Sequence, residues 1–213
     1  NGNVKLNNGE IKLNEFNTDY SFNGNLVFKP DEITINQIPI YDKLNSEGEL
    51  SAFFVHDNFT NYSYNVIGIF SEPFMVMNTE YEMNPLYFGD AYVTGFTTIT
   101  YDSIYDLDIN VDVKTEDNTF FTLPLYGAED VVLKDFISFK TNEIIEEEIR
   151  EVNLDGISLT LNLDLNENAE FELVFDEVVG DAIKARGEGH VDLLIDQFYN
   201  FSMFGKYTLS EGE

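Results

Sequence analysis

The segment GISLTLNLDLN, Gly156–Asn166, alternates strictly between apolar and polar residues. Apolar side chains take every odd position from Ile157 to Leu165, and polar side chains take every even position. Successive side chains of a strand point to opposite faces, so the segment is predicted to be a strand with one apolar and one polar face. The apolar face needs a partner, which could be a second sheet, lipid tails, or an apolar molecule held in an open trough.

The same alternation recurs in YDLDINVDV (105–113), AEFELVFDE (169–177) and HVDLLID (190–196). Turn-forming Asn, Asp and Gly residues interrupt the chain roughly every eight to twelve positions, which predicts an all-β fold of about fifteen short strands. The apolar sides of these strands are the candidate site for an apolar ligand. They comprise Leu107, Ile109, Val111, Val113, Ile157, Leu159, Leu161, Leu163, Leu165, Phe171, Leu173, Phe175, Val191, Leu193 and Ile195.

One segment departs from the two-residue period. In TNEIIEEEIREVN, Thr141–Asn153, the residues Ile145, Ile149 and Val152 follow a helical spacing. The segment is too acidic and too short to form a stable helix alone, so we expect a solvated insertion with helical spacing. We therefore divide the chain into a first β segment (1–140), an acidic linker (141–155) and a second β segment (156–213) continuous with the first.

Composition excludes several classes of protein. The chain of 213 residues carries 40 Asp+Glu against 11 Lys+Arg, a formal charge of -29, which disfavours binding to nucleic acids and anionic membrane surfaces. It has no cysteine, so disulfides and thiolate-bound metals are excluded. No apolar run is long enough for a transmembrane helix, and the chain starts without an initiator Met or signal peptide. We expect a segment of a longer protein.

No catalytic constellation emerges from the residues. His56 and His190 lie in strand-like segments without a nucleophile turn, and we interpret both as polar-face residues. The segment DLDINVDVKTED fails as a calcium loop, because Val111 takes the position of the required Gly and Asp117 that of the Glu. We predict no enzyme activity, no cofactor and no metal site.

Two linked blocks resemble one family. FMVMNTEYEMNPLYFGDAYVTGFTTITYDSIYDLDINVDVKTEDNTFFTLPL, Phe74–Leu125, and LTLNLDLNENAEFELVFDEVVGDAIKARGEGHVDLLIDQFYNFSMFGKYTLSEGE, Leu159–Glu213, are similar to the C-terminal domain of the TamB family. The likeness is greatest to the form found in Bacteroidetes, although Ala185 replaces the usual Gly before Arg186.

The resemblance implies a β-taco, a sheet curled along its length into a U-shaped groove with an apolar interior. It also implies a periplasmic location, within a protein anchored in the inner membrane of a Gram-negative bacterium. The implied function is phospholipid transfer toward the outer membrane and support of outer-membrane biogenesis, with phospholipid acyl chains and a TamA-like, BamA-related barrel as partners.

Three alternatives remain at this stage. Alternation alone is equally typical of a closed β-sandwich that serves adhesion or interaction. A membrane barrel fits less well, since it needs strands of about 9–11 residues with aromatic girdles, and the strands look shorter. An open apolar sheet could also chaperone outer-membrane strands by β-augmentation.

Overall fold

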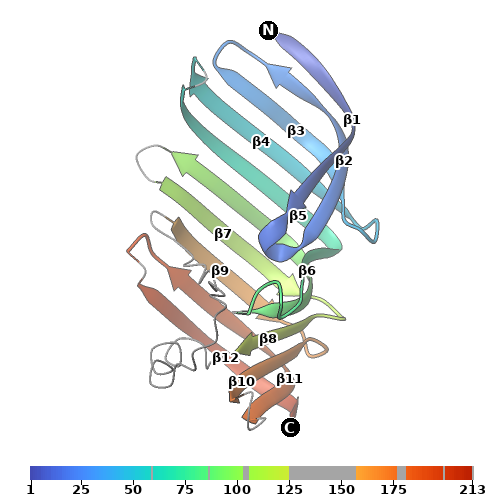
Figure 1. Ribbon diagram of the computed structural model, residues 1–213, viewed down its shortest axis with the longest axis vertical. Coiled ribbons are helices and arrows are strands. Elements are labelled where there is room, and N and C mark those ends of the chain that lie inside the picture. The colour runs from blue at the N-terminus through green and yellow to red at the C-terminus, as the bar shows by residue number, and fades with distance from the viewer. Residues whose placement is uncertain are drawn as a thin grey trace, which may run out of the picture.

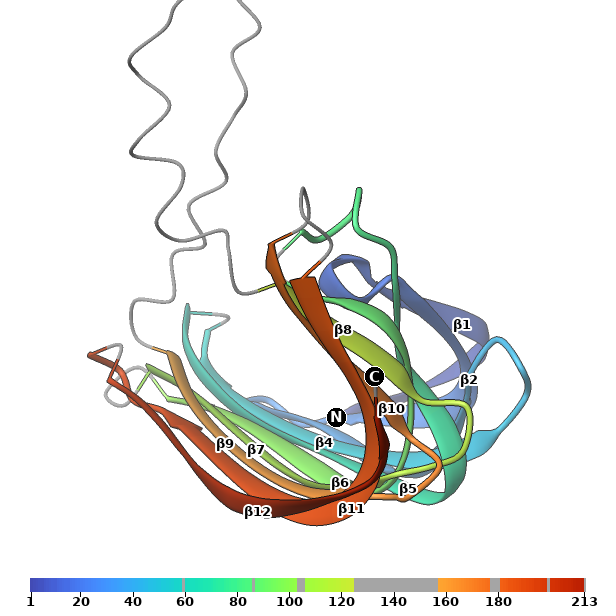
Figure 2. The same ribbon diagram turned by 90° about the horizontal axis from the view of Figure 1, so that it is seen from below.

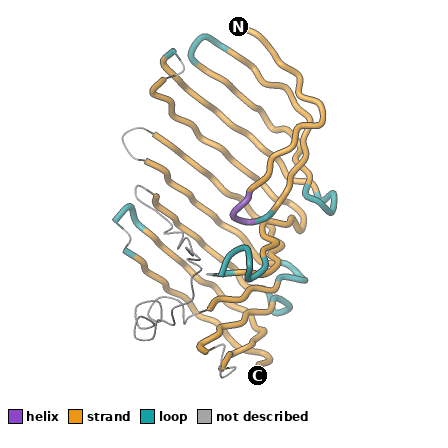
Figure 3. The backbone as a smooth tube through the Cα atoms, viewed as in Figure 1, coloured by secondary structure: helices purple, strands orange, loops and turns teal. Residues whose placement is uncertain are grey.

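The computed structural model describes residues 1–58, 60–85, 87–102, 106–124, 157–176, 181–198 and 200–212. The described part is all-β, as predicted, and its one helical element is a short 3-10 turn, η1 (Figure 3). In chain order the elements are β1 (Gly2–Leu13), η1 (Asn14–Phe16), β2 (Thr18–Phe28), β3 (Glu32–Tyr41), β4 (Glu47–Asp57), β5 (Thr60–Thr79), β6 (Phe88–Asp102), β7 (Asp106–Thr115), β8 (Phe120–Pro124), β9 (Ile157–Leu165), β10 (Glu170–Asp176), β11 (Asp181–Ile195) and β12 (Phe201–Gly212).

All twelve of these strands belong to one sheet, in which β1 to β7 follow chain order and β9, β11 and β12 continue the row (Figure 1). The sheet therefore differs from a sandwich of two facing sheets. The strands of the described residues are longer than expected from sequence, and β5 spans 20 residues. Ten strands follow one another from β1 to β12, so at a spacing of about 4.8 Å the row extends about 43 Å.

The sheet bends along a line that crosses neighbouring strands. The pairing of β5 with β6 shifts between Phe70 and Phe74, and Gly95 beside this shift has a φ of +134°. A Cβ on Gly95 would lie 2.3 Å from the carbonyl oxygen of Asp112, so only glycine fits this close approach. On the next strands, turns at 116–119 and 166–169 separate β7 from β8 and β9 from β10. We call this line of irregularities the corner.

The strands pair in the same way on both sides of the corner. Residue 107 of β7 pairs in parallel with residue 157 of β9, and residue 120 of β8 pairs in parallel with residue 170 of β10. The corner turns stack, because the Glu170 amide donates to the Thr119 carbonyl oxygen at 2.9 Å. Seen along the molecule, β8 and β10 rise from the layer of β7 and β9 (Figure 2).

The pairings close a ring of six strands, in the order β6, β7, β9, β11, β10, β8 and back to β6. The expected groove, open along its whole length, is therefore not confirmed, because six strands of the sheet form a closed ring. Its physical cause is the corner: β7 and β8 pair with successive parts of β6, and β11 likewise pairs with β9 and then β10. The expected acidic insertion, 141–155, lies outside the described residues.

Candidate functional site

One face of the sheet is apolar across nearly every strand. The pairings place Leu107 beside Ile157, Val111 beside Leu161, and Leu161 beside Leu193, so predicted residues from three strands share this face. The face is the inner one, because Tyr20 of β2 stacks on Phe74 of β5 at 5.2 Å although β3 and β4 lie between them in the sheet. A residue of β2 can reach β5 in this way only across the concave side of a curved sheet.

The inner face is organised in rows that cross the strands. The rim row lies farthest from the corner and consists of Phe28, Ile33, Phe54, Tyr64, Tyr101, Leu107 and Ile157. The next row consists of Leu26, Ile35, Ala52, Val66, Ile99, Ile109, Leu159 and Ile195. Apolar contact is therefore continuous through seven strands in one row and eight in the other.

Burial rises from the rim to the corner. The rim-row side chains are all half-buried, whereas the corner side chains Phe22, Ile40, Phe70, Phe74 and Val113 are buried and form one cluster. Phe74 is fully buried and stacks on Phe70 with ring centroids 4.7 Å apart. The corner end of the inner face is thus a packed core, and the rim end leaves apolar surface in contact with solvent.

Polar groups fix the corner. Burial raises the pKa of Tyr20 to about 12, and its hydroxyl donates to the Met75 carbonyl oxygen at 3.0 Å. The buried carboxylate of Asp42 accepts backbone N–H bonds from Leu44, Ser46 and Met75 at 2.8 to 2.9 Å. This carboxylate joins the turn between β3 and β4 to the bent part of β5.

The corner divides this part of the sheet into two walls: β7, β9 and the part of β11 that pairs with β9 form the first wall, and β8, β10 and the rest of β11 form the second wall. A line of aromatic rings follows the second wall. Ring centroids are 6.4 Å apart for Phe16 and Tyr87, 6.5 Å for Tyr87 and Phe121, 6.2 Å for Phe121 and Phe171, and 6.1 Å for Phe171 and Tyr207. The predicted Phe171 therefore belongs to this line. The predicted Leu173 pairs with Leu123 and Ile183 on the same wall, and Phe175 near the end of β10 is exposed.

Most of the predicted residues meet on the first wall. The pairings bring together Leu107, Ile109, Val111, Val113, Ile157, Leu159, Leu161, Leu163, Leu165, Val191, Leu193 and Ile195. All are half-buried except Val113, which belongs to the packed corner.

The first hundred residues also contribute to this surface, although none of their side chains was predicted to line it. Their inner face was obscured because apolar side chains also occupy the outer face, where Phe53, Ile69 and Phe96 are exposed. Alternation in 50–56 and 97–101 was the available signal.

The two histidines occupy opposite faces. His190 lies on the outer face between Asp164, at 2.6 Å from Nδ1, and Asp192, at 3.0 Å from Nε2, and these carboxylates raise its pKa. The interpretation of His56 as a polar-face residue is wrong, because His56 is buried at the end of β4 beside the rim row. Residues two positions apart in a strand share a face, so the sequence alone already implied that His56 lies on the same side as Phe54.

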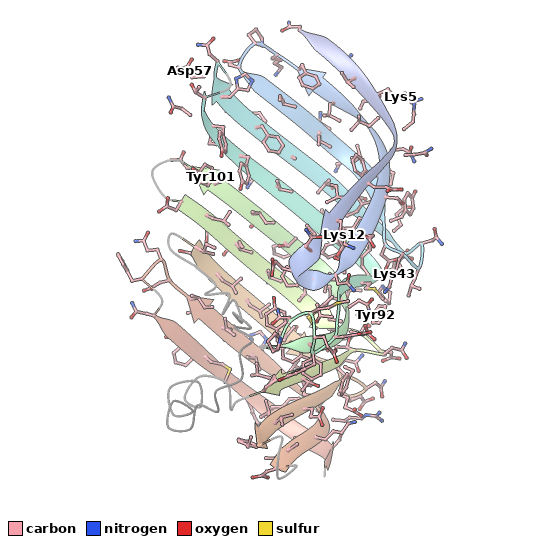
Figure 4. All side chains as sticks on the ribbon, viewed as in Figure 1. Lys5, Lys12, Lys43, Asp57, Tyr92 and Tyr101 are labelled. Carbon is pink, nitrogen blue, oxygen red and sulfur yellow. The ribbon has the colours of Figure 1, made fainter. Side chains whose placement is uncertain are left out.

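A shallow depression of about 250 Å³ lies beside the rim row. It is lined by Ile33, Phe54, Val55, His56, Tyr62 and Tyr64. Tyr64 stacks on Tyr101 at 5.3 Å, and Tyr62 lies 5.4 Å from Tyr101. Burial raises the pKa of Tyr64, and the neighbouring hydroxyls of Tyr62 and Tyr101 raise it further. Figure 4 shows Tyr101 and Asp57 at the same margin of the sheet.

Within the described ranges no group of three or more His, Asp or Glu side chains could hold a metal ion. Of the described elements, no helix is long and apolar enough to cross a membrane.

The fold and the inner face define a class of protein: a long, curved β-sheet whose concave side is lined by apolar rows, with a packed corner and a half-exposed rim. Residues 40–213 match the TamB C-terminal domain, and the chain belongs to this family. It is thereby part of the translocation and assembly module of the cell envelope, whose TamB domain is periplasmic. Neither the search of curated proteins nor that of solved structures found a match.

Proposed function

We propose that this chain is a segment of a bridge-like protein that conducts phospholipids between the inner and outer membranes. The acyl chains move along the rim side of the inner face. The observation that carries the proposal is the continuity of the apolar rows, one of which crosses eight paired strands from Leu26 to Ile195. No step along this path obliges a lipid tail to enter water.

Energetics support a lining rather than a tight pocket. Each methylene removed from water stabilises a lipid by about 0.8 kcal/mol, so crossing water is costly for a two-chain lipid. A lining with few polar groups lowers this cost equally at every position, and a lipid can then move without a deep energy minimum. The rim rows have this character, whereas the packed corner lends them rigidity.

The longer protein would be anchored in the inner membrane and would meet a TamA- or BamA-like barrel at the outer membrane. Membership of the TamB family supports this part of the proposal. These partners make outer-membrane biogenesis the process that the lipid path serves.

A photo-crosslinking amino acid at Leu159 tests the lipid path. Leu159 is half-buried on the inner face, in the row next to the rim row, and Thr160 is the matched control on the outer face, where it pairs with Asn110 and Leu194. Phospholipid should be captured at position 159 and not at 160, as read by mass spectrometry. Equal capture at both positions, or none at either, would contradict the proposal.

A second function is supported by the ends of the sheet. Within the described residues β1 pairs only with β2, and β12 pairs only with β11, so each presents an unpaired edge. Such an edge can take up an extended strand of another protein, as a chaperone of outer-membrane barrels would. Crosslinking along β12 to a nascent barrel protein, without lipid capture at Leu159, would favour this function over lipid transfer.

A further inference from the structure

The tyrosine cluster at the rim is chemically unlike the rest of the inner face. Outside this cluster, the rim row and the row next to it are mostly aliphatic. In the cluster, β5 and β6 place Tyr62, Tyr64 and Tyr101 together with ring-centroid separations of 5.3 to 6.5 Å. Tyr62 is 54% exposed. Tyrosine is suited to a boundary between apolar and polar surroundings, because its ring is apolar and its hydroxyl is polar.

The depression beside the cluster suits an acyl chain. Its lining is apolar apart from His56 and the tyrosine hydroxyls, and it is continuous with the rim row through Ile33 and Phe54. A chain lying in the rim row can therefore enter it without leaving the apolar surface. A headgroup attached to that chain would then lie against the rings of Tyr62 and Tyr101.

The charge around the depression is negative. The hairpins that border it carry the carboxylates of Asp31, Glu32, Asp57, Asp102 and Asp106. Lys29 on the same border already pairs with Glu32 at 2.6 Å. A purely anionic headgroup would be repelled here, whereas an ammonium group would be attracted by the carboxylates and by the ring faces.

We propose that the depression and the cluster of Tyr62, Tyr64 and Tyr101 form a lipid-binding site that prefers zwitterionic phospholipids with an ammonium headgroup over anionic ones. One acyl chain lies in the depression, and the ammonium group lies over the tyrosine rings. This inference rests on the proposed lipid path and adds the class of lipid. The chain's formal charge of -29 acts in the same direction.

The test is competition between two lipids with identical acyl chains. The full chain is incubated with vesicles of equimolar phosphatidylethanolamine and phosphatidylglycerol, repurified, and analysed for bound lipid by mass spectrometry. The tyrosine rings and the carboxylates should both contribute to the enrichment of phosphatidylethanolamine. Because exposed cation–ring contacts have modest energies, the contribution of the rings should be about two- to fivefold. Added salt should weaken the contribution of the carboxylates.

Three variants separate the causes. Tyr62→Leu keeps an apolar side chain but removes the ring, so the enrichment should fall while total bound lipid stays the same. Tyr62→Phe keeps the ring and should retain the enrichment. Phe96→Leu removes an exposed ring from the outer face of β6 and should change neither quantity.

The outcomes distinguish this inference from the proposed function. Bound lipid without enrichment of phosphatidylethanolamine, or enrichment that Tyr62→Leu leaves unchanged, would contradict the proposed lipid-binding site but not the proposed lipid path. Enrichment of phosphatidylglycerol would also contradict this lipid-binding site. Recovery of no lipid of either class would overturn both.

Discussion

The two ends of the same strands differ in what they do with apolar side chains. At the corner, β2, β5, β6 and β7 bury Phe22, Phe74, Val93 and Val113 in one cluster. At the rim β5, β6 and β7, together with β4, leave Phe54, Tyr64, Tyr101 and Leu107 half-exposed. Because strands of 10 to 20 residues join the two ends, the packed corner can hold an exposed apolar surface in place. Apolar alternation thus indicates a shared face but not whether that face is closed.

The largest contrast is expected when a charge is placed at each end. Val113→Arg buries a cation in the packed corner and should unfold the protein or cost several kcal/mol. Leu159→Arg, in the row next to the rim row, should fold nearly normally, since arginine can reach water past its own stem at a half-buried site. Urea denaturation measures both, and equal destabilisation would show that the two sites are equally closed.

Truncation of aromatic side chains compares the two ends without adding charge. Phe74→Ala removes a fully buried ring that contacts Phe70 and Tyr20, and should cost about 3–5 kcal/mol of unfolding free energy. Phe54→Ala at the rim should cost about 1–2 kcal/mol, because part of its ring is already in water. A rim cost as large as the corner cost would contradict the difference in packing.

The buried carboxylate tests how the corner is held. Asp42→Ala leaves three backbone N–H groups without their acceptor and should cost about 2–3 kcal/mol. Asp42→Asn retains one acceptor oxygen and should recover part of this stability. If Asp42→Ala unfolds at the wild-type urea concentration, water replaces the carboxylate and the corner does not depend on it.

The smallest effect is expected on the outer face, at His190. Asp164 and Asp192 raise the pKa of its imidazole, so the charged form is stabilised in the folded protein. A raised folded pKa means that this contribution is fully present below about pH 6.5 and is lost as the pH rises through the folded value. His190→Gln should therefore lower the melting temperature slightly at pH 5.5, with a smaller difference at pH 8.5. A difference that grows with pH would reverse the assigned sign.

Much of the first wall was predictable from the sequence. Strict alternation in 157–165 and 105–113 determined which side chains share a face, since the two-residue period leaves no freedom once a strand forms. The parallel pairing of β7 with β9 was not predictable, because it depends on contacts between segments fifty residues apart.

The corner was not predictable for a different reason. It depends on bulges and on close backbone approach, as at Gly95, and neither changes the apolar pattern. The tyrosine cluster likewise needs the register that sets Tyr64 of β5 beside Tyr101 of β6, which periodicity does not supply.

Thiol labelling along β7 tests the central contrast most directly, because the chain has no cysteine of its own. Single Cys substitutions at Leu107, Ile109, Val111 and Val113 follow the inner face from the rim to the corner, with Asp112 as an exposed control on the outer face. Labelling by a small thiol reagent should be about tenfold or more faster for Ile109→Cys than for Val113→Cys, since reaction at a buried site requires opening. Equally slow labelling at all four inner positions, with a fast control, would mean that the inner face is closed throughout and would contradict an apolar surface accessible to lipid.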